Sequence, residues 1–554
     1  MRCRFGFGSI AASLFVGGLI ALSVTGNAGC SVIYSDGADQ CSTDGDCHAR
    51  GLASSTCSPD RVCIAGCVND DQCTQENGGR ASLCGSDSKC VKLEIDGCTL
   101  PRDAQGALIA AYKDPNAIFI GELSARTSTQ IPGSDAANQL VMADDEIRTT
   151  QPQGLPGGPG GGRRPLVRVT CETGDDPARM SAYAKHFVDV VNAPIIISAW
   201  NNHAIRVHTA VTASKKSVLE YCVACTADIR RFAAGGGDVS TIFSGTAAGV
   251  DIAPGIAAKA SDVENVVRAN PSFSGDTVRL ALLVTTGLEG APTEQTADEV
   301  LKTLRFNGKS AAENGSDYRL FQYSATSDRQ ALAKQVASFA PHILIPITLA
   351  EANQTLFPLI EGNWPAGAIR PEYVGSVGQQ QASMIQLVQG NDDLRRRVVI
   401  VNLSPAPQSP QRLADWQTNY GQRFGPPGLA PLAYDAYYAI AYMIVAAGTP
   451  PTGKLTGTDV VRSLSKLKGA GSTFFVGPGD LVAGMSTVVT GPINLSGLVL
   501  PFNFNLDTGR MKVPQIPIIC IGRPPTGPLT FAAAGQLFNV ASQTLQGTYS
   551  CPGG

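Results

Sequence analysis

The sequence has no marked excess of charge, because 43 lysines and arginines against 46 aspartates and glutamates leave a formal net charge of −3. A protein that binds nucleic acid is expected to carry a strong basic bias, so the composition does not indicate such a partner. Beyond residues 10–24, no stretch approaches the ~20 consecutive apolar residues that a membrane-spanning helix needs. The composition therefore favours a globular protein.

The sequence also lacks the patterns that identify most enzymes. A glycine- and proline-rich run at 154–162 does not end in the G-K-[ST] of a phosphate-binding loop, and prolines interrupt it. We find no nucleophile–base pair, no pair of catalytic carboxylates and no cofactor fingerprint. His203 and His208 have no partners at the spacing of a metal site. We therefore expect a protein that is not an enzyme and that has no cofactor and no metal.

An export signal is predicted at the N-terminus. Two arginines precede the apolar run 10–24, which is too short and too early for a lasting membrane span. Gly29-Cys30 resembles the site cut by lipoprotein signal peptidase, so we predict a signal peptide at 1–29 and a lipid-modified Cys30. The alternative is ordinary cleavage after Ala28. Either way, the chain is expected in the cell envelope (periplasm or outer membrane).

Cysteines are concentrated in residues 30–98. Eight of them form four C-x5-C units, which make two similar repeats. They are Cys41, Cys47, Cys57 and Cys63 in the first repeat, and Cys67, Cys73, Cys84 and Cys90 in the second. Zinc sites favour closer pairs, and an exported chain meets oxidants, so we predict two disulfides per repeat. Three pairings are possible in each repeat.

The repeats also carry acidic residues in their turns. These are Asp44, Asp46, Asp70 and Asp71. Their oxygens are suitable calcium ligands, but we interpret them as solvated turn residues. A module of this size is too small for a large core, so we interpret it as a disulfide-stabilised spacer or interaction module.

Six further cysteines follow, an even number. Cys520 and Cys551 are expected to tie down a C-terminal tail at 526–554. Cys222 and Cys225 have the C-x-x-C spacing of redox proteins. They end a predicted strand, however, without the helix start that would lower a thiol pKa, so we interpret them as structural or unpaired.

Residues 166–200 form the clearest structural unit. A strand rich in valine at 166–171 is followed by Asp176-Pro177, an acidic cap and a proline at the first helical position. Apolar residues then recur at helical spacing, and 195–198 is a continuous apolar run, typical of a strand buried on both faces. This pattern predicts a βαβ unit of a parallel sheet, at whose strand ends small ligands usually bind.

A second series of alternating elements begins near residue 278. Strands are predicted at 278–286, 318–323, 342–347 and 372–376, and helices at 293–304, 328–339 and 350–360. Such alternation predicts a doubly wound α/β fold with parallel sheets, in two blocks that separate near 242–249.

The order of these segments resembles the type I periplasmic solute-binding proteins of the leucine/isoleucine/valine-binding group, which are related to receptor ligand-binding domains. The matching segments, over roughly residues 112–522, are AIFIGELSART, GGGRRPLVRVTCETGDDPARMSAYAKHFV, NAPIIISAW, HILIPITLAEANQTLFPLI, APLAYDAYYAIAYMIVAAG and TGPINLSGLVLPFNFNLDTGRMKVPQIPIICI. The resemblance implies two α/β lobes joined by three crossover strands. We expect this domain at 110–525, with a first lobe at 110–243 and 378–505 and a second lobe at 244–377 and 506–525.

The resemblance also implies where a ligand would bind. In this family, hydroxyls and backbone N–H groups that follow two first-lobe strands often fix an amino acid's carboxylate. The matching and neighbouring positions are Ser198, Ala199, Trp200, Cys225 and Thr226 in the first lobe, and Thr286 and Thr348 in the second. Ser198 and Thr226 have the alternative role of capping the next helices, and Trp200 that of packing. Glu289 and Glu351 are candidate partners for an ammonium group.

We therefore expect an exported, lipid-anchored protein that captures a small polar organic ligand in an interlobe cleft, for transport or sensing. An amino acid or another small carboxylate is the expected ligand, and an ABC transporter permease or a sensor protein the expected partner. The alternative is a surface or structural protein with an inert copy of the binding fold, in which the cysteine-rich module does the work.

Overall fold

The computed structural model describes residues 39–50, 55–57, 61–103, 105–128, 133–157, 159–233, 237–287, 291–402, 408–450, 453–525 and 527–553. The predicted signal peptide, Cys30 and Glu289 lie outside the described residues. The chain divides into two compact units, Met1–Gly66 and Cys67–Gly554. Within the described part of the chain, none of the helices combines the length and the apolar character needed to cross a membrane.

Each cysteine-rich repeat is a short helix followed by a two-stranded antiparallel hairpin. The elements are α1 (Asp44–Ala49), β1 (Ser55–Cys57) and β2 (Cys63–Ala65) in the first repeat, and α2 (Asp70–Glu76), β3 (Ser82–Cys84) and β4 (Cys90–Lys92) in the second. Both repeats join their first cysteine to the third and the second to the fourth. The bonds are Cys41–Cys57, Cys47–Cys63, Cys67–Cys84 and Cys73–Cys90. The predicted disulfide-rich module is therefore confirmed, with one of the three possible pairings used in both repeats.

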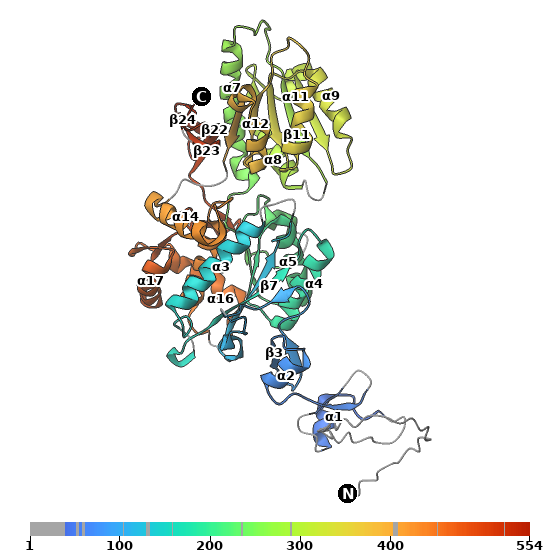
Figure 1. Cartoon of the computed structure of the whole chain (residues 1–554), viewed down its shortest axis with the longest axis vertical. Helices are drawn as coiled ribbons and strands as arrows, with labels where there is room; N and C mark the ends of the chain where they lie inside the picture. Colours follow the sequence, from blue (N-terminus) through green and yellow to red (C-terminus); the bar gives the residue numbers. More distant parts are fainter. Residues whose placement is uncertain are drawn as a thin grey trace, which may run out of the picture. The chain divides into compact units, whose positions relative to one another are not determined.

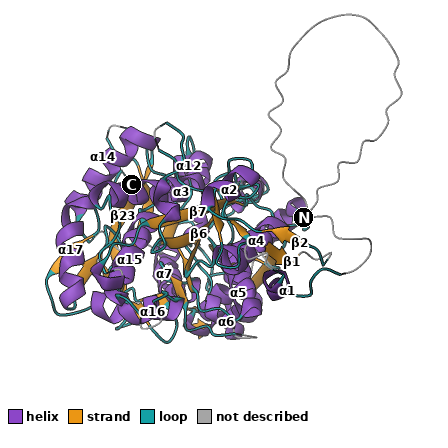
Figure 2. Ribbon diagram, turned by 90° about the horizontal axis from the view of Figure 1, so that it is seen from below, coloured by secondary structure: helices purple, strands orange, loops and turns teal. Residues whose placement is uncertain are grey.

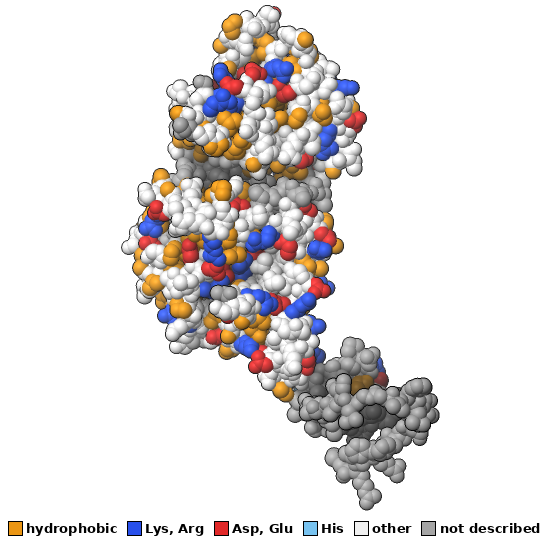
Figure 3. Space-filling view, viewed as in Figure 1, with side chains coloured by type: hydrophobic (Ala, Val, Ile, Leu, Met, Phe, Trp, Pro, Cys, Tyr) orange, Lys and Arg blue, Asp and Glu red, His pale blue; other side chains and the backbone are white. Residues whose placement is uncertain are grey.

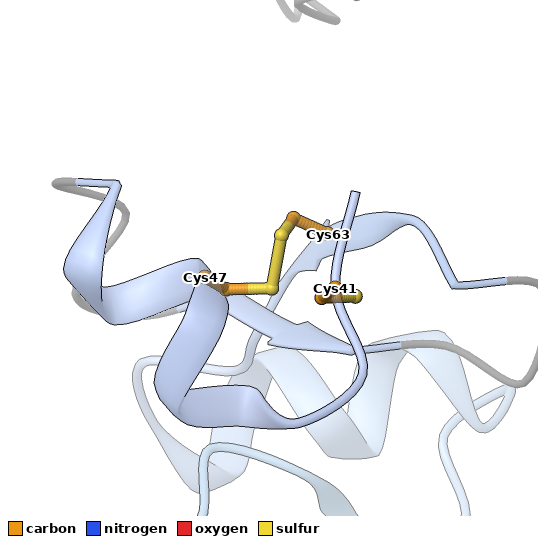
Figure 4. A group of neighbouring side chains, drawn as sticks. All are labelled: Cys41, Cys47 and Cys63. Atoms are coloured by element: carbon orange, nitrogen blue, oxygen red, sulfur yellow. A yellow bond between two sulfur atoms is a disulfide. The ribbon is translucent and has the colours of Figure 1, made fainter. Parts of the chain in front are cut away.

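The acidic residues expected in turns lie instead in the first turns of α1 and α2, and Asp44 and Asp70 bind backbone groups. The carboxylate of Asp44 accepts the N–H of Cys57 at 2.7 Å, and that of Asp70 accepts the N–H of Cys84 at 2.7 Å. The sulfur of Cys41 lies close to the neighbouring bridge of the first repeat (Figure 4). Because all these sulfurs are bonded in disulfides, they present no thiolate to a metal ion.

The second repeat packs on the larger domain. Ala81 and Leu93 are 0% and 1% exposed and belong to a core cluster of that domain. The buried carboxylate of Glu94 accepts the N–H groups of Ala81 and Leu100, both at 2.8 Å. After the second repeat, the disulfide Cys98–Cys171 joins the chain to strand 166–172 of the larger domain. The second repeat is therefore part of the same compact unit as the α/β domain.

The first lobe is built on an eight-stranded sheet with the order β20-β21-β10-β9-β8-β6-β7-β5. Strands β6 to β10 are mutually parallel. The sheet strands are β5 (Cys98–Thr99), β6 (Ile118–Ser124), β7 (Leu166–Glu172), β8 (Ile195–Ser198), β9 (Leu219–Cys222), β10 (Ile242–Ser244), β20 (Phe504–Asn505) and β21 (Arg510–Met511); a small separate sheet has β18 (Thr473–Phe475) and β19 (Asn494–Ser496).

Helices cover both faces of this sheet (Figure 2). They are α3 (Gly133–Thr150), α4 (Pro177–Lys185), α5 (Asn201–Ser214), α6 (Ile229–Ala233), α14 (Pro410–Phe424), α15 (Leu432–Ala447), α16 (Gly457–Arg462) and α17 (Pro478–Thr490). α3 and α15 share a core cluster with one face of β6 and β8, and α4 and α5 with the other. The predicted βαβ unit is confirmed as β7, α4 and β8. Asp176 caps α4 by accepting the N–H groups of Ala178 and Arg179.

A buried ionic network lies between the first sheet and α3. Arg168 of β7 is 6% exposed and binds Glu122 of β6, which is 2% exposed. The Nε of Arg168 lies 3.7 Å from one carboxylate oxygen of Asp144 on α3. The other carboxylate oxygen of Asp144 accepts the hydroxyl of Tyr437 at 2.7 Å. Buried charges are costly unless they are paired and hydrogen bonded, and here each carboxylate has partners.

The segment APLAYDAYYAIAYMIVAAG forms α15, and its aspartate, Asp435, holds residues 498–500. Asp435 is 0% exposed and accepts the backbone N–H groups of Leu498, Val499 and Leu500 at 2.9–3.0 Å. Burial raises the pKa of Asp435 to about 7, outweighing these three hydrogen bonds.

The second lobe is built on another eight-stranded sheet, with the order β14-β11-β15-β16-β17-β22-β23-β24. Figure 1 labels β11, β22, β23 and β24 of this sheet in the upper part of the picture. β14 to β17 run parallel with β11, and β22 to β24 are antiparallel. The strands are β11 (Leu280–Thr285), β14 (Tyr318–Tyr323), β15 (Ile343–Ile347), β16 (Glu372–Gly375), β17 (Val398–Val401), β22 (Gln515–Gly522), β23 (Thr530–Asn539) and β24 (Thr544–Gly547); β12 (Arg305–Phe306) and β13 (Lys309–Ser310) form a separate hairpin.

The helices of the second lobe begin with α7, which follows β10 of the first sheet, and the others follow strands of the second sheet in the chain. They are α7 (Gly249–Ala269), α8 (Ala291–Thr303), α9 (Arg329–Phe339), α10 (Ala352–Thr355), α11 (Phe357–Gly362), α12 (Ala382–Val388) and α13 (Asp392–Arg396). With the first sheet, they give the expected fold class, two α/β lobes after a disulfide-rich module.

The chain passes between the two sheets three times: at 245–248, between β17 and α14, and at 512–514. Two of these passages differ from the expected boundaries. β17 belongs to the second sheet, although 378–505 was assigned to the first lobe, and β21 belongs to the first sheet, although 506–525 was assigned to the second. A buried strand such as VVIV has the same sequence pattern in either sheet, so its pattern does not reveal which one it joins.

The C-terminal tail extends the second sheet. β23 and β24 add two antiparallel strands beyond β22. The expected bond between Cys520 and Cys551 is present. The ammonium of Lys259, which is 2% exposed on α7, binds Gln536 of β23 at 2.9 Å and lies over the ring of Tyr549. The tail is therefore an integral part of the second lobe.

Candidate ligand-binding site

The first sheet reverses its strand order between β6 and β8. From β6 the chain adds β7 on one side and then β8 on the other, which makes this position the topological switch point. A small hollow lies there, formed by the ends of β6 and β8, the residue after β9, and the start of α3. Residues that line it include Ser124, Gly133, Ala136, Leu140, Ala199 and Val223. Ligands of open α/β sheets bind at such switch points, outside the carboxyl ends of the strands.

The loops around the hollow are held by Glu172 at the end of β7. Its carboxylate accepts the hydroxyl of Ser124 at 2.8 Å, both the N–H and the hydroxyl of Thr127, and the N–H groups of Arg126 and Gly174. Partial burial opposes its ionisation, but these hydrogen bonds lower the pKa of Glu172 below its ordinary value. Glu172 thus positions two loops that frame the hollow. Sequence reasoning did not single it out.

Ser198, Ala199 and Trp200 lie together at the end of β8. Ala199 lines the hollow. Ser198 is 2% exposed, and because Ile197 packs toward α3, alternation along the strand directs Ser198 toward the α4 and α5 face. The residue before α5 is Trp200, so Ser198 does not cap that helix. Its role as a ligand contact stays a prediction.

Trp200 brings an unsatisfied donor to this edge. Its side chain is half-buried, and its indole N–H is buried with no acceptor among the described residues. Nearby on α5, His203 is 1% exposed, and its Nε2 lies 2.9 Å from the hydroxyl of Thr173. Burial lowers the pKa of His203 to about 4, so this ring is neutral at pH 7.

The loop after β9 carries Cys225 and Thr226. Cys222 and Cys225 form a buried disulfide at its start. Asn201 of α5 then holds the loop, because its amide donates to the Thr226 hydroxyl at 3.1 Å and accepts the N–H of Ala227 at 2.9 Å. The first-lobe candidates therefore come together at one edge, with the Thr226 hydroxyl already bonded within its own lobe.

The second sheet has its switch point between β11 and β15, since the chain adds β14 and β15 on opposite sides of β11. Thr286 follows β11 and Thr348 follows β15, so both candidates flank this point. The Thr286 hydroxyl donates to the carbonyl of Tyr323 at 3.1 Å. Thr348 is 2% exposed, and its hydroxyl accepts the amide of Gln379 at 2.9 Å. Both hydroxyls are thus engaged within the second lobe.

A polar cluster stands next to Thr286. The hydroxyl of Tyr323 donates to the carboxylate of Glu351 at 2.9 Å, and the guanidinium of Arg329 lies 5.3 Å from the Tyr323 ring centre. The Glu351 side chain is 37% exposed. Sequence reasoning proposed Glu351 but missed Tyr323 and Arg329, because they belong to different elements and share no spacing motif.

An ionic hub joins the two lobes near the first and third passages. Arg510 of β21 binds both carboxylate oxygens of Asp251 on α7 at 2.9 Å, and its Nη1 binds Asp228 at 2.6 Å. Asp228, which follows β9, also donates its N–H to Gln295 of α8 at 3.1 Å. The hub therefore connects the loop after β9 with two second-lobe helices.

On the face shown in Figure 3, basic and acidic side chains are intermingled. They do not gather into a patch of one sign there, in keeping with the near-neutral net charge.

A scan against protein-family models finds no match, and a search of curated proteins finds no similar sequence. Solved structures do match. A leucine-binding protein from Thermotoga maritima is 13% identical, with 77% of this chain and 99% of that chain covered and a TM-score of 0.52. A solute-binding protein of an ABC transporter from Rhodopseudomonas palustris, in complex with 3,4-dihydroxybenzoic acid, is 13% identical, with 77% and 98% covered and a TM-score of 0.50.

A possible leucine/isoleucine/valine-binding protein from Rhodopirellula baltica is 12% identical, with 76% of this chain and 97% of that chain covered and a TM-score of 0.50. At these identities the likeness concerns the fold. This chain has the fold of the type I periplasmic solute-binding proteins, preceded by a disulfide-rich module.

Proposed function

We propose that this protein captures a small polar organic ligand between its two lobes. The observation that carries the proposal is the position of the hollow at the switch point of the first sheet, where α/β proteins bind their ligands. The second sheet has its own switch point, flanked by Thr286 and Thr348. A ligand held at both points contacts both lobes.

The chemistry of the site supports an amphipathic ligand. Alanine, leucine and valine side chains line most of the hollow. The polar residues that line it are Glu122 and Ser124. At the end of β8, Trp200 has an indole N–H without an acceptor among the described residues, and the second lobe carries the partly exposed carboxylate of Glu351 near its own switch point. The indole N–H of Trp200 suits a carboxylate, and Glu351 suits an ammonium group. An amino acid or another small carboxylate combines these features with an apolar body.

The location and partners follow from the same proposal. Seven disulfides join the described cysteines, which suits an oxidising compartment. We infer export to the cell envelope and lipid anchoring at Cys30. The captured ligand is then delivered to an ABC transporter permease or reported to a sensor protein. The proposal assigns no catalytic step to the site.

A specific observation favours the second candidate, an inert copy of the fold in a structural surface protein. The hydroxyl oxygens of Thr226 and Thr348 each accept an amide N–H, from Asn201 and Gln379, within their own lobes. A site that has lost its ligand is expected to fill its polar contacts in this way. In that case the cysteine-rich module is the working part.

Thermal shift measurements with amino acids and small aromatic carboxylates distinguish the two candidates. A ligand present at 100 times its Kd stabilises a receptor by about 2.7 kcal/mol. We expect one class of compound to raise Tm, and Ser198→Ala with Thr226→Ala to abolish the shift. Thr209→Ala, an exposed threonine on α5, is the matched control and should retain it. A panel without any shift would support the inert copy.

A further inference from the structure

The disulfide between Cys222 and Cys225 lies where the candidate site meets the first passage between the lobes. Cys222 is the last residue of β9, and Cys225 follows three positions later. Their side chains are 1% and 0% exposed. The bridge therefore closes a four-residue loop inside the protein, and it is out of reach of a large reductase in this conformation.

The bridged loop holds the end of β8. The N–H of Val223 donates to the carbonyl of Ser198 at 2.8 Å, and the N–H of Ala224 donates to the carbonyl of Ala199 at 3.1 Å. The side chain of Val223 lines the hollow together with Ala199. The two residues between the cysteines thus continue the pairing of β8 and β9 beyond the strands and form one wall of the site.

The cysteines themselves hold the first passage between the lobes. The carbonyl of Cys222 accepts the N–H of Gly245 at 2.8 Å, and the carbonyl of Cys225 accepts the hydroxyls of Ser244 at 3.2 Å and Thr246 at 3.0 Å. A Cβ at position 245 would lie 2.8 Å from the Val223 carbonyl, so only glycine permits this close approach. The passage is therefore packed directly on the bridged loop.

We infer that the Cys222–Cys225 disulfide is a positioning element of the ligand site, which sets the wall at Val223 and couples it to the passage at 244–246. This inference rests on the proposed function. It assigns the pair no redox chemistry. Without the bridge, the loop gains conformational freedom, and both the end of β8 and the passage lose a fixed partner.

A purely stabilising role predicts a different pattern. The stability that a disulfide gives by restricting the unfolded chain grows with the length of the loop it closes. Cys222 and Cys225 are separated by 3 positions and Cys520 and Cys551 by 31. If both bridges only stabilise the fold, removal of Cys520–Cys551 should lower the stability of the protein more than removal of Cys222–Cys225 and should speed amide exchange more in every segment. If the first positions the site, its removal should affect the site more, whatever the change in Tm.

Hydrogen–deuterium exchange of the full chain tests this without a ligand. We expect Cys222→Ala with Cys225→Ala to speed amide exchange at 198–200 and 244–249 by about tenfold or more. The control, Cys520→Ala with Cys551→Ala, should leave those segments unchanged and speed exchange in β23. Unchanged exchange at 198–200 and 244–249 in the first variant would overturn the inference.

If the first variant does not fold, a second one keeps the bridge. Ser244→Ala with Thr246→Val removes both hydroxyl donors to the Cys225 carbonyl. Exchange at 245–249 should then rise several-fold while 198–200 stays protected. No change at 245–249 would overturn the coupling between the bridged loop and the passage.

A ligand arm separates this inference from the proposed function. The probes are L-leucine and 3,4-dihydroxybenzoate, followed by any compound that shifts Tm. We expect the Cys222/Cys225 variant to lose at least tenfold in affinity and the Cys520/Cys551 variant to bind as the wild type. Equal affinity in both variants would overturn the inference. If no compound binds the wild type, the proposed function fails, and the exchange experiment still decides the role of the bridge.

Discussion

The hub at Arg510 should contribute strongly to the stability of the two-lobe domain. Arg510 makes a two-point contact with Asp251 and a third hydrogen bond with Asp228. The three side chains are 15%, 31% and 21% exposed, so water screens them less than a surface pair. Hydrogen bonds that involve charged groups contribute about 1.5–3 kcal/mol each before screening. We expect Arg510→Gln to lower the free energy of unfolding by about 2–4 kcal/mol.

A double-mutant cycle isolates the contact between Arg510 and Asp251. The two single variants are Arg510→Gln and Asp251→Asn. Asp251→Asn keeps a side-chain oxygen that can accept the N–H of Ala248, a bond that Asp251 makes at 2.8 Å. Urea unfolding of the wild type, the two single variants and the double variant should give a coupling energy of about 2 kcal/mol. The control cycle is Lys302 with Glu299 on α8, a pair 63% and 27% exposed, for which about 0.2–0.5 kcal/mol is expected. Equal coupling in the two cycles would refute the reasoning.

Three further predictions concern buried polar groups. The folded-state pKa of Asp435 is about 7, above its ordinary 3.8, so its contribution to the free energy of unfolding is full below pH 4 and is lost as the pH rises through 7. Asp435→Asn should remove up to about 4 kcal/mol of this pH dependence, as measured by unfolding at pH 4–8. Glu94→Ala leaves two buried N–H groups without an acceptor, so we expect a loss of about 2–4 kcal/mol and faster amide exchange at 81–93; unchanged exchange would contradict the docking of the second repeat. Lys259→Met removes the buried ammonium, so amide exchange at 530–547 should become faster while exchange in the first lobe stays slow. Slow exchange in both the tail and the first lobe would show that other contacts hold the tail.

Local signals in the sequence predict much of the fold. Asp176 and Pro177 mark the start of α4, and the continuous apolar run at 195–198 marks β8, because capping and burial leave a pattern in neighbouring residues. The even number of later cysteines and the position of Cys551 indicated the bond to Cys520. Each of these inferences uses residues close in sequence or a simple count.

Contacts between distant segments could not be predicted in this way. Nothing in the sequence around Arg168 indicates its partners, yet it is buried against Glu122 and Asp144. Arg510 meets Asp251 across 259 positions. Sequence spacing carries no information about such pairs, because the topology of two sheets brings them together.

The candidate site shows the same division. Ser198 and Thr348 lie at strand ends next to the switch points, as expected from the order of elements. The direction of the Ser198 side chain and the bond between Thr348 and Gln379 depend on packing that the sequence does not show. The role of Glu172 in holding the loops around the hollow was missed, because most of its partners lie in a loop about 45 positions earlier in the chain.

The most direct test of the central claim is a crystal structure of the protein with a compound that raises its Tm. We expect electron density for that compound between the lobes, against Ala199 and Val223 in the first lobe and near Thr286 in the second. A compound bound on the cysteine-rich module or elsewhere on the surface, with the hollow beside Ser124 empty, would contradict it.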